Sequence, residues 1–197
     1  MKTIETPAES EIKVKKSLFI CRLYPVKTQK ESKKIINEIS NKYSDATHNC
    51  SAYIVIDGQG YDDDGEPSGT AGKPIINALK KNDLHNIVAI VTRYFGGIKL
   101  GSGGLTRAYS KSVLEAIANS QIIEIEYYDV YEVIFNYSDV KKVEQYLRNN
   151  QIHIINKEYS EKIYYNVIFK NHQNIEKIKE KLNIKINFKE KKVLKKI

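Results

Sequence analysis

The chain has 197 residues, of which 41% are apolar and 28% charged, and its net charge at pH 7 is +8. These values are typical of a soluble globular protein of one large or two small domains. The strongly apolar run Ile87–Val91 is far shorter than a membrane span, and the first 16 residues do not resemble a signal sequence. Two cysteines, Cys21 and Cys50, fit a reducing compartment. We therefore expect a cytoplasmic protein that does not enter membranes.

In the first part of the chain, strand patterns alternate with helix patterns. Alternating β-branched and aromatic residues indicate strands, the pair Thr28 and Glu31 forms a capping box, and apolar residues at helical spacing indicate helices. The most apolar of the strands should lie at the centre of its sheet. The predicted elements are strands or hairpins over 11–26, 48–57 and 86–94, and helices over 28–43, from about 73, and over about 105–119.

After residue 120 the pattern changes to strand, helix, strand, strand, helix, strand within about 70 residues, which is the ferredoxin-like order. We therefore predict two closely spaced domains, over residues 1–123 and 124–197. The predicted strands of the second domain are 127–137, 151–159, 162–170 and 184–188, and its helices are 139–149 and 173–182.

All ten glycines lie between Gly58 and Gly104, in two loops over 58–72 and 94–104. Glycine occurs where the backbone needs a positive φ or where another group must approach closely. Because these two loops contain all ten glycines, we expect them to present backbone N–H groups to a ligand. We therefore look for the functional site there.

The second loop leads from a strand into a helix, whose first N–H groups have no partner inside the helix and can bind an anion. Three nearby cations, Arg93, Lys99 and Arg107, add positive charge. The pattern is neither a Walker A loop nor the dinucleotide fingerprint. A helix–strand junction that needs small residues is the alternative explanation. The candidate binding residues are Arg93, Tyr94, Gly96, Gly97, Lys99, Gly101, Gly103, Gly104, Arg107 and Tyr109.

The first loop carries an acidic cluster that includes Asp63, Asp64, Gly65 and Glu66. Clustered carboxylates can hold a divalent cation, but the spacing is not that of a calcium-binding EF-hand. A salt bridge from Asp64 or Glu66 to Arg93 or Arg107 is the favoured interpretation, with a weak metal site as the alternative. No cofactor or metal is predicted.

Two further patterns each allow a chemical and a structural interpretation. His48 and Cys50 project from the same face of a strand, as a nucleophilic pair or as ordinary buried residues. Tyr94 beside Arg93 and Tyr109 beside Arg107 provide stacking surfaces for nucleic-acid bases, or form core packing. The chain contains no DNA-specific motif and no zinc pattern.

The positive charge is concentrated at one end of the chain. Residues 185–197 hold six Lys and one Glu, and so supply five of the eight net charges. The tail lysines, Lys189 to Lys196, either solubilise the chain or contact nucleic-acid phosphates, and charge alone does not separate these roles.

Two long motifs resemble the IMPACT family in its bacterial YigZ-like form. They run from Asp63 to Pro74 (DDGEPSGTAGKP) and from Val91 to Tyr109 (VTRYFGGIKLGSGGLTRAY). The stretch His48–Tyr53 (HNCSAY) is also similar to the family, although Ser51 stands where an aromatic residue is common and Asp62 where Ser is usual.

The resemblance implies an N-terminal α/β domain like domain two of a ribosomal protein, a fold shared with translation factors and with small-molecule kinases of the GHMP class. It also implies a C-terminal ferredoxin-like domain similar to the last domain of elongation factor G. Eukaryotic relatives regulate translation initiation by competing for an activator of the starvation-sensing kinase. The resemblance supplies no established reaction for bacterial members.

Two hypotheses for the function follow. The first is a translation-linked binding protein that contacts RNA, the ribosome or a regulatory protein through the glycine loops and the basic C-terminus. The second is a nucleotide- or phosphometabolite-binding enzyme that uses Leu100–Gly104 as a phosphate loop. We favour the first, because neither a second nucleotide element nor a convincing catalytic base is evident.

Overall fold

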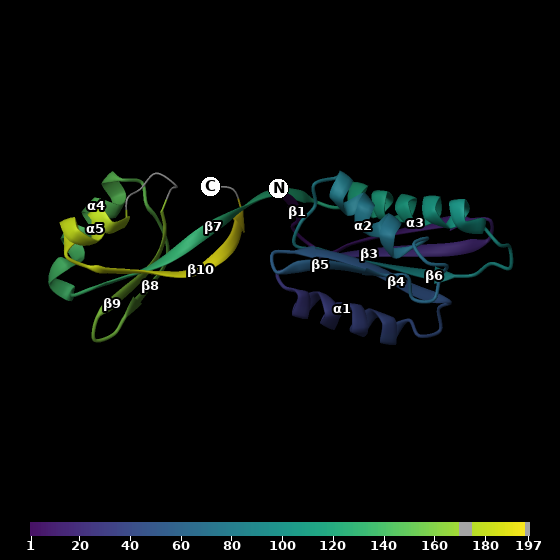
Figure 1. Cartoon of the computed structure of the whole chain (residues 1–197), viewed down its shortest axis with the longest axis horizontal. Coiled ribbons are helices and arrows are strands. Elements are labelled where there is room, and N and C mark those ends of the chain that lie inside the picture. Colours follow the sequence, from purple (N-terminus) through teal and green to yellow (C-terminus); the bar gives the residue numbers. More distant parts are fainter. Residues whose placement is uncertain (170–174, 196–197) are drawn as a thin grey trace. The chain divides into compact units, whose positions relative to one another are not determined.

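The computed structural model describes residues 1–169 and 175–195 (Figure 1). The chain divides into two compact parts, unit 1 (Met1–Ile125) and unit 2 (Glu126–Ile197). Each unit combines helices with a β-sheet. The predicted two-domain α+β fold is therefore confirmed.

Unit 1 is built on an antiparallel sheet with the strand order β2-β3-β6-β4-β5. The most apolar strand, β6, lies at its centre, as the sequence predicts. The short strand β1 pairs instead with the start of β7. The elements are β1 (Lys2–Ile4), β2 (Ala8–Val14), β3 (Ser17–Pro25), α1 (Gln29–Lys42), β4 (His48–Val55), β5 (Gly58–Asp62), α2 (Gly72–Lys81), β6 (Ile87–Tyr94), α3 (Gly101–Ala118) and β7 (Ile122–Phe135).

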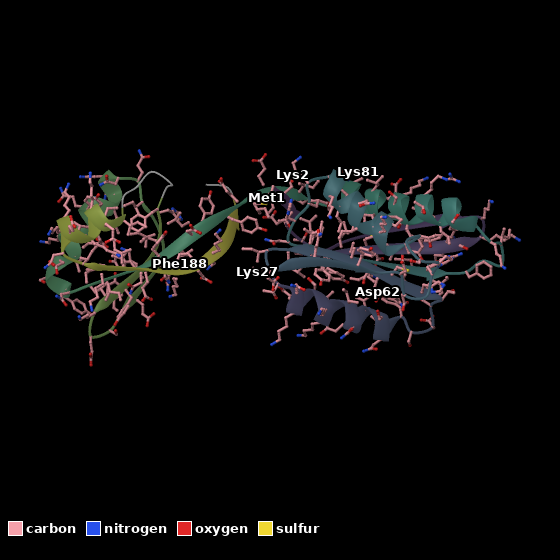
Figure 2. All side chains as sticks on the ribbon, viewed as in Figure 1. Met1, Lys2, Lys27, Asp62, Lys81 and Phe188 are labelled. Atoms are coloured by element: carbon pink, nitrogen blue, oxygen red, sulfur yellow. The ribbon has the colours of Figure 1, made fainter. Side chains whose placement is uncertain are left out.

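Helices cover both faces of this sheet (Figure 1), and side chains fill the space on each side of it (Figure 2). On one face, Phe19 and Val91 pack in a core with α2 and α3. On the other face, Val88 and Ile90 pack with Ile39 of α1. Strand β6 is thus buried on both sides, which explains its almost uninterrupted apolar sequence.

The predicted glycine loops differ from the observed structure in two places. Part of the first loop forms strand β5, which pairs along β4 at the edge of the sheet. Helix α3 begins at Gly101, four residues before the predicted start, so Gly103 and Gly104 lie in its first turn. Glycine has a low propensity for both helices and strands, so sequence analysis misses both strand β5 and the start of helix α3.

Unit 2 has the element order β7, η1 (Tyr137–Asp139), α4 (Val140–Asn149), β8 (His153–Tyr159), β9 (Ile163–Ile168), α5 (Ile175–Leu182) and β10 (Lys185–Lys195). Its strands lie in the order β10-β7-β9-β8. Both helices contribute to one core, in which Leu147 and Leu182 meet Val133 and Tyr165 of the sheet. This arrangement is consistent with the predicted ferredoxin-like order.

The last strand corrects the sequence-based view of the C-terminal tail. Strand β10 is predicted to end at residue 188 but continues to Lys195. Charged residues at successive positions obscure its alternation, yet the strand pairs with β7. The tail lysines from Lys189 to Lys195 therefore belong to the sheet, and Lys196 lies outside the described residues.

The domain boundary between residues 123 and 124 remains a prediction, which limited proteolysis tests. We expect a glutamate-specific protease to cut early at the exposed Glu126, because backbone at the boundary between compact units is accessible. The product should be a stable C-terminal fragment of about 70 residues. Early cutting inside β6, with residues 120–127 protected, would contradict two separately folded domains.

Replacing either of two glycines near the second loop by alanine should change the stability of the protein in opposite directions. A Cβ at Gly96 would overlap the backbone carbonyl of Lys16, whereas a Cβ at Gly103 would meet only the Arg107 guanidinium at 3.8 Å. We expect Gly96→Ala to lower the free energy of unfolding by about 1–3 kcal/mol. Gly103→Ala should raise it by up to about 1 kcal/mol, because alanine favours the helix. Urea denaturation measures both, and equal effects would contradict this distinction.

Candidate functional site

A pocket of about 430 Å³ lies in unit 1, where β4, β6 and the acidic loop (Asp63–Glu66) meet the amino end of α3. This volume is in the range of small-molecule sites. Its apolar lining comes from Pro67, Phe95, Leu100 and Leu105. Its polar lining comes from Thr47, His48, Glu66, Arg93, Lys99 and Ser102, and Gly101 completes it.

A buried ion pair forms one side of the pocket. The side chains of Glu66 and Arg93 are only 3% and 6% exposed, and Arg93 Nη1 donates to Glu66 Oε1 at 2.5 Å. The Tyr109 hydroxyl donates to the same oxygen at 2.8 Å. Removing one partner of such a pair leaves an uncompensated buried charge, which typically costs about 3–5 kcal/mol. Of the salt bridges that the sequence favours, from Asp64 or Glu66 to Arg93 or Arg107, the structure contains the one between Glu66 and Arg93.

The rest of the Arg93 guanidinium is held by aromatic rings. Its central carbon lies 5.4 Å from the ring centre of Phe19 and 5.5 Å from that of Phe95. Arg93 Nε is buried and has no hydrogen-bond partner among the described residues. Arg93 is thus a fixed charge inside the fold rather than a mobile surface cation.

Tyr109 and Cys50 lie beneath the pocket. Tyr109 is fully buried, and the Cys50 thiol donates to its hydroxyl oxygen at 3.3 Å. Burial raises the pKa of both groups well above their usual range, so both stay protonated at neutral pH. The predicted stacking of Tyr109 on a base is therefore wrong, because its ring faces the core beside Phe19. A nucleophilic Cys50 thiolate is excluded for the same physical reason.

His48 is oriented by the acidic loop. Its Nδ1 lies 2.7 Å from the carbonyl oxygen of Asp64, which can only accept, so Nδ1 carries the proton. The opposite nitrogen, Nε2, lies 3.9 Å from Glu66 Oε2. His48 therefore turns toward Glu66 instead of pairing with Cys50, whose thiol also lies 3.0 Å from the carbonyl oxygen of Asp63.

Asp63 fixes the acidic loop against helix α2. Its carboxylate accepts from the backbone N–H groups of Gly69, Ala71 and Gly72 at 2.7–3.0 Å. Burial disfavours its ionised form, but these three donors outweigh that effect and lower the pKa of Asp63. Ala71 has no side-chain oxygen to cap the helix, so Asp63 supplies the cap from eight residues away.

The other acidic-loop residues also serve the fold. Asp64 Oδ2 accepts from the Asn49 N–H at 2.5 Å, and Gly65 adopts a φ of +82° that turns the chain toward Glu66. In the part of the chain that the structure describes, no three His, Cys, Asp or Glu side chains gather closely enough to hold a metal ion. The loop thus links β4 to the pocket.

The structure gathers only some of the predicted binding residues at the pocket. Arg93, Lys99 and Gly101 line it. Tyr94, half-buried, bonds through its hydroxyl to Asp45 Oδ1 at 3.3 Å, away from the lining. Gly96, Gly97, Gly103, Gly104 and Arg107 lie in the loop or first turns of α3 without lining the pocket.

Sequence analysis missed several lining residues, including Thr47, Phe95 as a pocket wall, and Ser102. Phe95 follows Arg93 by two residues at the end of β6, so the strand period offers a signal that both face the same side. Thr47 precedes β4 and belongs to no recognisable sequence pattern. In the structure, its hydroxyl accepts a hydrogen bond from the Phe95 N–H at 2.9 Å. Only the pairing of β4 with β6 brings it to the site.

Comparison with known proteins identifies the family. The model of the Impact N-terminal domain matches residues 15–117, a span that contains every pocket-lining residue. The IMPACT family member YvyE of Bacillus subtilis (strain 168) is 43% identical over 164 residues, which cover 82% of this chain and 76% of that protein. The chain belongs to the IMPACT family.

Other comparisons support this IMPACT assignment. The IMPACT family member YigZ of Escherichia coli (strain K12) is 40% identical over 109 residues, or 53% of each chain, which confirms the YigZ-like resemblance. A solved structure described as that of an hypothetical protein is 28% identical and has a TM-score of 0.70. That similarity covers 96% of this IMPACT chain and 97% of the other.

No described helix is both long and apolar enough to cross a membrane.

The cap provided by Asp63 predicts a pH-dependent stability. The pKa of Asp63 is lowered by folding, so its stabilising effect is present above the unfolded pKa of about 3.9 and is lost as the pH falls through the folded value. We expect Asp63→Asn to lower the free energy of unfolding at pH 7 by about 1–3 kcal/mol. The difference from wild type should shrink between about pH 5 and pH 2.

Urea denaturation at several pH values measures this difference. Glu115→Gln removes an exposed carboxylate from α3 and provides the matched control, which should leave the stability nearly unchanged at each pH. A wild-type advantage over Asp63→Asn that stays constant down to pH 2 would contradict the assigned role of the carboxylate.

Proposed function

We propose that this IMPACT-family protein acts in the control of translation by binding RNA, either free or within the ribosome. The family assignment supports the link to translation, because the resemblance implies that eukaryotic members regulate translation initiation. The contact with RNA is argued from the charges and surfaces of each unit taken separately.

The observation that carries the proposal is the placement of lysines on strand β10. Ile186 is buried in the core under α4 and α5, so the alternating residues Lys185 and Lys189 point to the opposite face of the sheet. Lys189 Nζ confirms this direction, since it reaches Asn166 Oδ1 at 3.1 Å and Glu132 Oε1 at 3.3 Å. Lys191 follows with the same alternation and is exposed. These lysines form a row.

An aromatic ring lies on the same face as this lysine row. Tyr165 is in the core, so its neighbour Tyr164 points to the opposite face, where Asn166 also lies. Tyr164 is half-buried and pairs in register with Ile134 of β7. A sheet that presents an aromatic ring among lysines and amides can stack a base and bind phosphates together. In the described part of unit 2, both α-helices pack on the other face.

A second basic surface lies in unit 1. Lys99 and Arg107 are exposed beside the first turn of α3, where Gly101 and Gly103 are also exposed. No side chain of the N-cap residue Leu100 bonds to the free N–H groups of this turn. Phosphates of RNA fit such a helix end, because its dipole and N–H groups favour an anion.

The test of the proposal removes the lysine row without disturbing the strand. Truncation within β10 is unsuitable, because the strand pairs with β7. We expect the triple change Lys185→Gln, Lys189→Gln and Lys191→Gln to weaken binding to single-stranded RNA at least tenfold. It should also reduce the slope of log K against log salt by up to about 2, since each lost phosphate contact removes roughly 0.7. Fluorescence anisotropy across a salt series gives both values.

The matched control is the triple change Lys27→Gln, Lys30→Gln and Lys33→Gln, which alters the net charge equally at exposed positions around α1. This control should keep most of the affinity and the salt slope. Equal losses in both triples would indicate a non-specific charge effect. RNA and ribosome binding that is undetectable at low salt in the wild type would overturn the proposal and favour a protein partner.

A further inference from the structure

The pocket of unit 1 has two chemically different ends. One end is the amino terminus of α3 with Lys99, and the other is the buried pair of Glu66 and Arg93 together with His48. Phe95, Leu100 and Leu105 form the apolar wall of the pocket. A ligand that fills this space needs an anionic group at one end and hydrogen-bonding groups at the other.

The α3 end has the features of an anion site. Helix α3 runs for 18 residues, and its N-cap residue Leu100 offers no side-chain acceptor to the first N–H groups. Gly101 and Ser102, whose N–H groups open the helix, line the pocket. A Cβ at Gly103 would meet no backbone and only the tip of Arg107, so packing does not require glycine there. An open first turn allows a phosphate to approach closely.

The opposite end contains one buried polar atom, Arg93 Nε, without a hydrogen-bond partner among the described residues. The Arg93 side chain is buried, so this Nε also lacks access to bulk water. Glu66 is buried as well, both of its hydrogen bonds fall on Oε1, and its Oε2 faces His48 Nε2. Native proteins rarely leave such groups unsatisfied, so each unpartnered group needs an explanation. A polar ligand in the pocket supplies one.

The separation between His48 and Glu66 fits ligand hydroxyl groups. Glu66 Oε2 and His48 Nε2 are 3.9 Å apart, too far for a direct hydrogen bond. The Asp64 carbonyl keeps the proton on His48 Nδ1, so Nε2 presents a lone pair when the ring is neutral. Two neighbouring acceptors, one on the buried Glu66 and one on the partly exposed His48, favour a ligand with hydroxyl donors.

We propose that this pocket binds a sugar phosphate. The phosphate lies at the first turn of α3 beside Lys99, the hydroxyl groups lie at His48 and Glu66, and the carbon skeleton lies along the apolar wall. The same chemistry occurs in a free sugar phosphate and in the first nucleotide of a 5′-phosphorylated RNA. The proposal does not depend on RNA binding by the lysine row of β10, and it concerns binding only.

Calorimetric titration of the full chain tests the proposal with inorganic phosphate, ribose 5-phosphate, ribose, and a short RNA with or without a 5′-phosphate. We expect ribose 5-phosphate to bind more tightly than inorganic phosphate, and ribose not to bind. Binding of the 5′-phosphorylated RNA that inorganic phosphate competes away, with no such competition for the unphosphorylated RNA, would assign the RNA end as the source of the sugar phosphate.

Three variants locate the site. Lys99→Gln should weaken ribose 5-phosphate binding about tenfold, the effect of losing one charge-assisted contact. Lys111→Gln, on the exposed side of the same helix and outside the pocket lining, is the matched control and should bind as wild type does. His48→Gln should remove the advantage of ribose 5-phosphate over inorganic phosphate while leaving phosphate binding intact.

The outcomes separate this site from the lysine row. The β10 triple variant should bind ribose 5-phosphate normally, whether or not it binds RNA, because its changes lie in unit 2. Absence of binding to every phosphorylated probe at millimolar concentration would overturn the sugar-phosphate proposal. Equal weakening by Lys99→Gln and Lys111→Gln would also overturn it, because the binding would then follow overall charge.

Discussion

The ion pair between Glu66 and Arg93 is the interaction on which unit 1 depends most. Glu66 comes from the acidic loop and Arg93 from the central strand β6, and Tyr109 brings α3 to the same carboxylate oxygen. Three elements that are distant in the sequence therefore meet at one buried atom. Because an unpaired buried charge is costly, losing either Glu66 or Arg93 should destabilise unit 1 as long as the other is present.

This constraint explains why the two long family motifs belong together. The first motif carries Glu66 and its supporting residue Asp63, and the second carries Arg93 and Tyr109. The pair uses one oxygen of Glu66 and one nitrogen of Arg93, and it leaves Arg93 Nε buried without a hydrogen-bond partner among the described residues. The interaction that joins these three elements therefore also forms one side of the pocket.

Much of the fold can be predicted from the sequence, because β6 is uniformly apolar and the second unit repeats clear strand and helix periods. The helix cap at Thr28 is also predictable, since its hydroxyl accepts a hydrogen bond from the Glu31 N–H as the capping-box motif requires. Other features depend on tertiary contacts. Tyr109 resembles a surface aromatic beside Arg107 until α3 is packed on the sheet, and the lysines of β10 resemble a free tail until β7 pairs with them.

The pairing of β1 with β7 also has a consequence for the order of folding during synthesis. Lys2 lies opposite Glu124, so β1 is without its strand partner β7 until more than a hundred further residues have been synthesised. Contacts of such large sequence separation form slowly. The sheet around β6 can assemble earlier, because β3, β4 and β6 all precede α3. Closure of β1 is therefore a late event that signals the completion of unit 1.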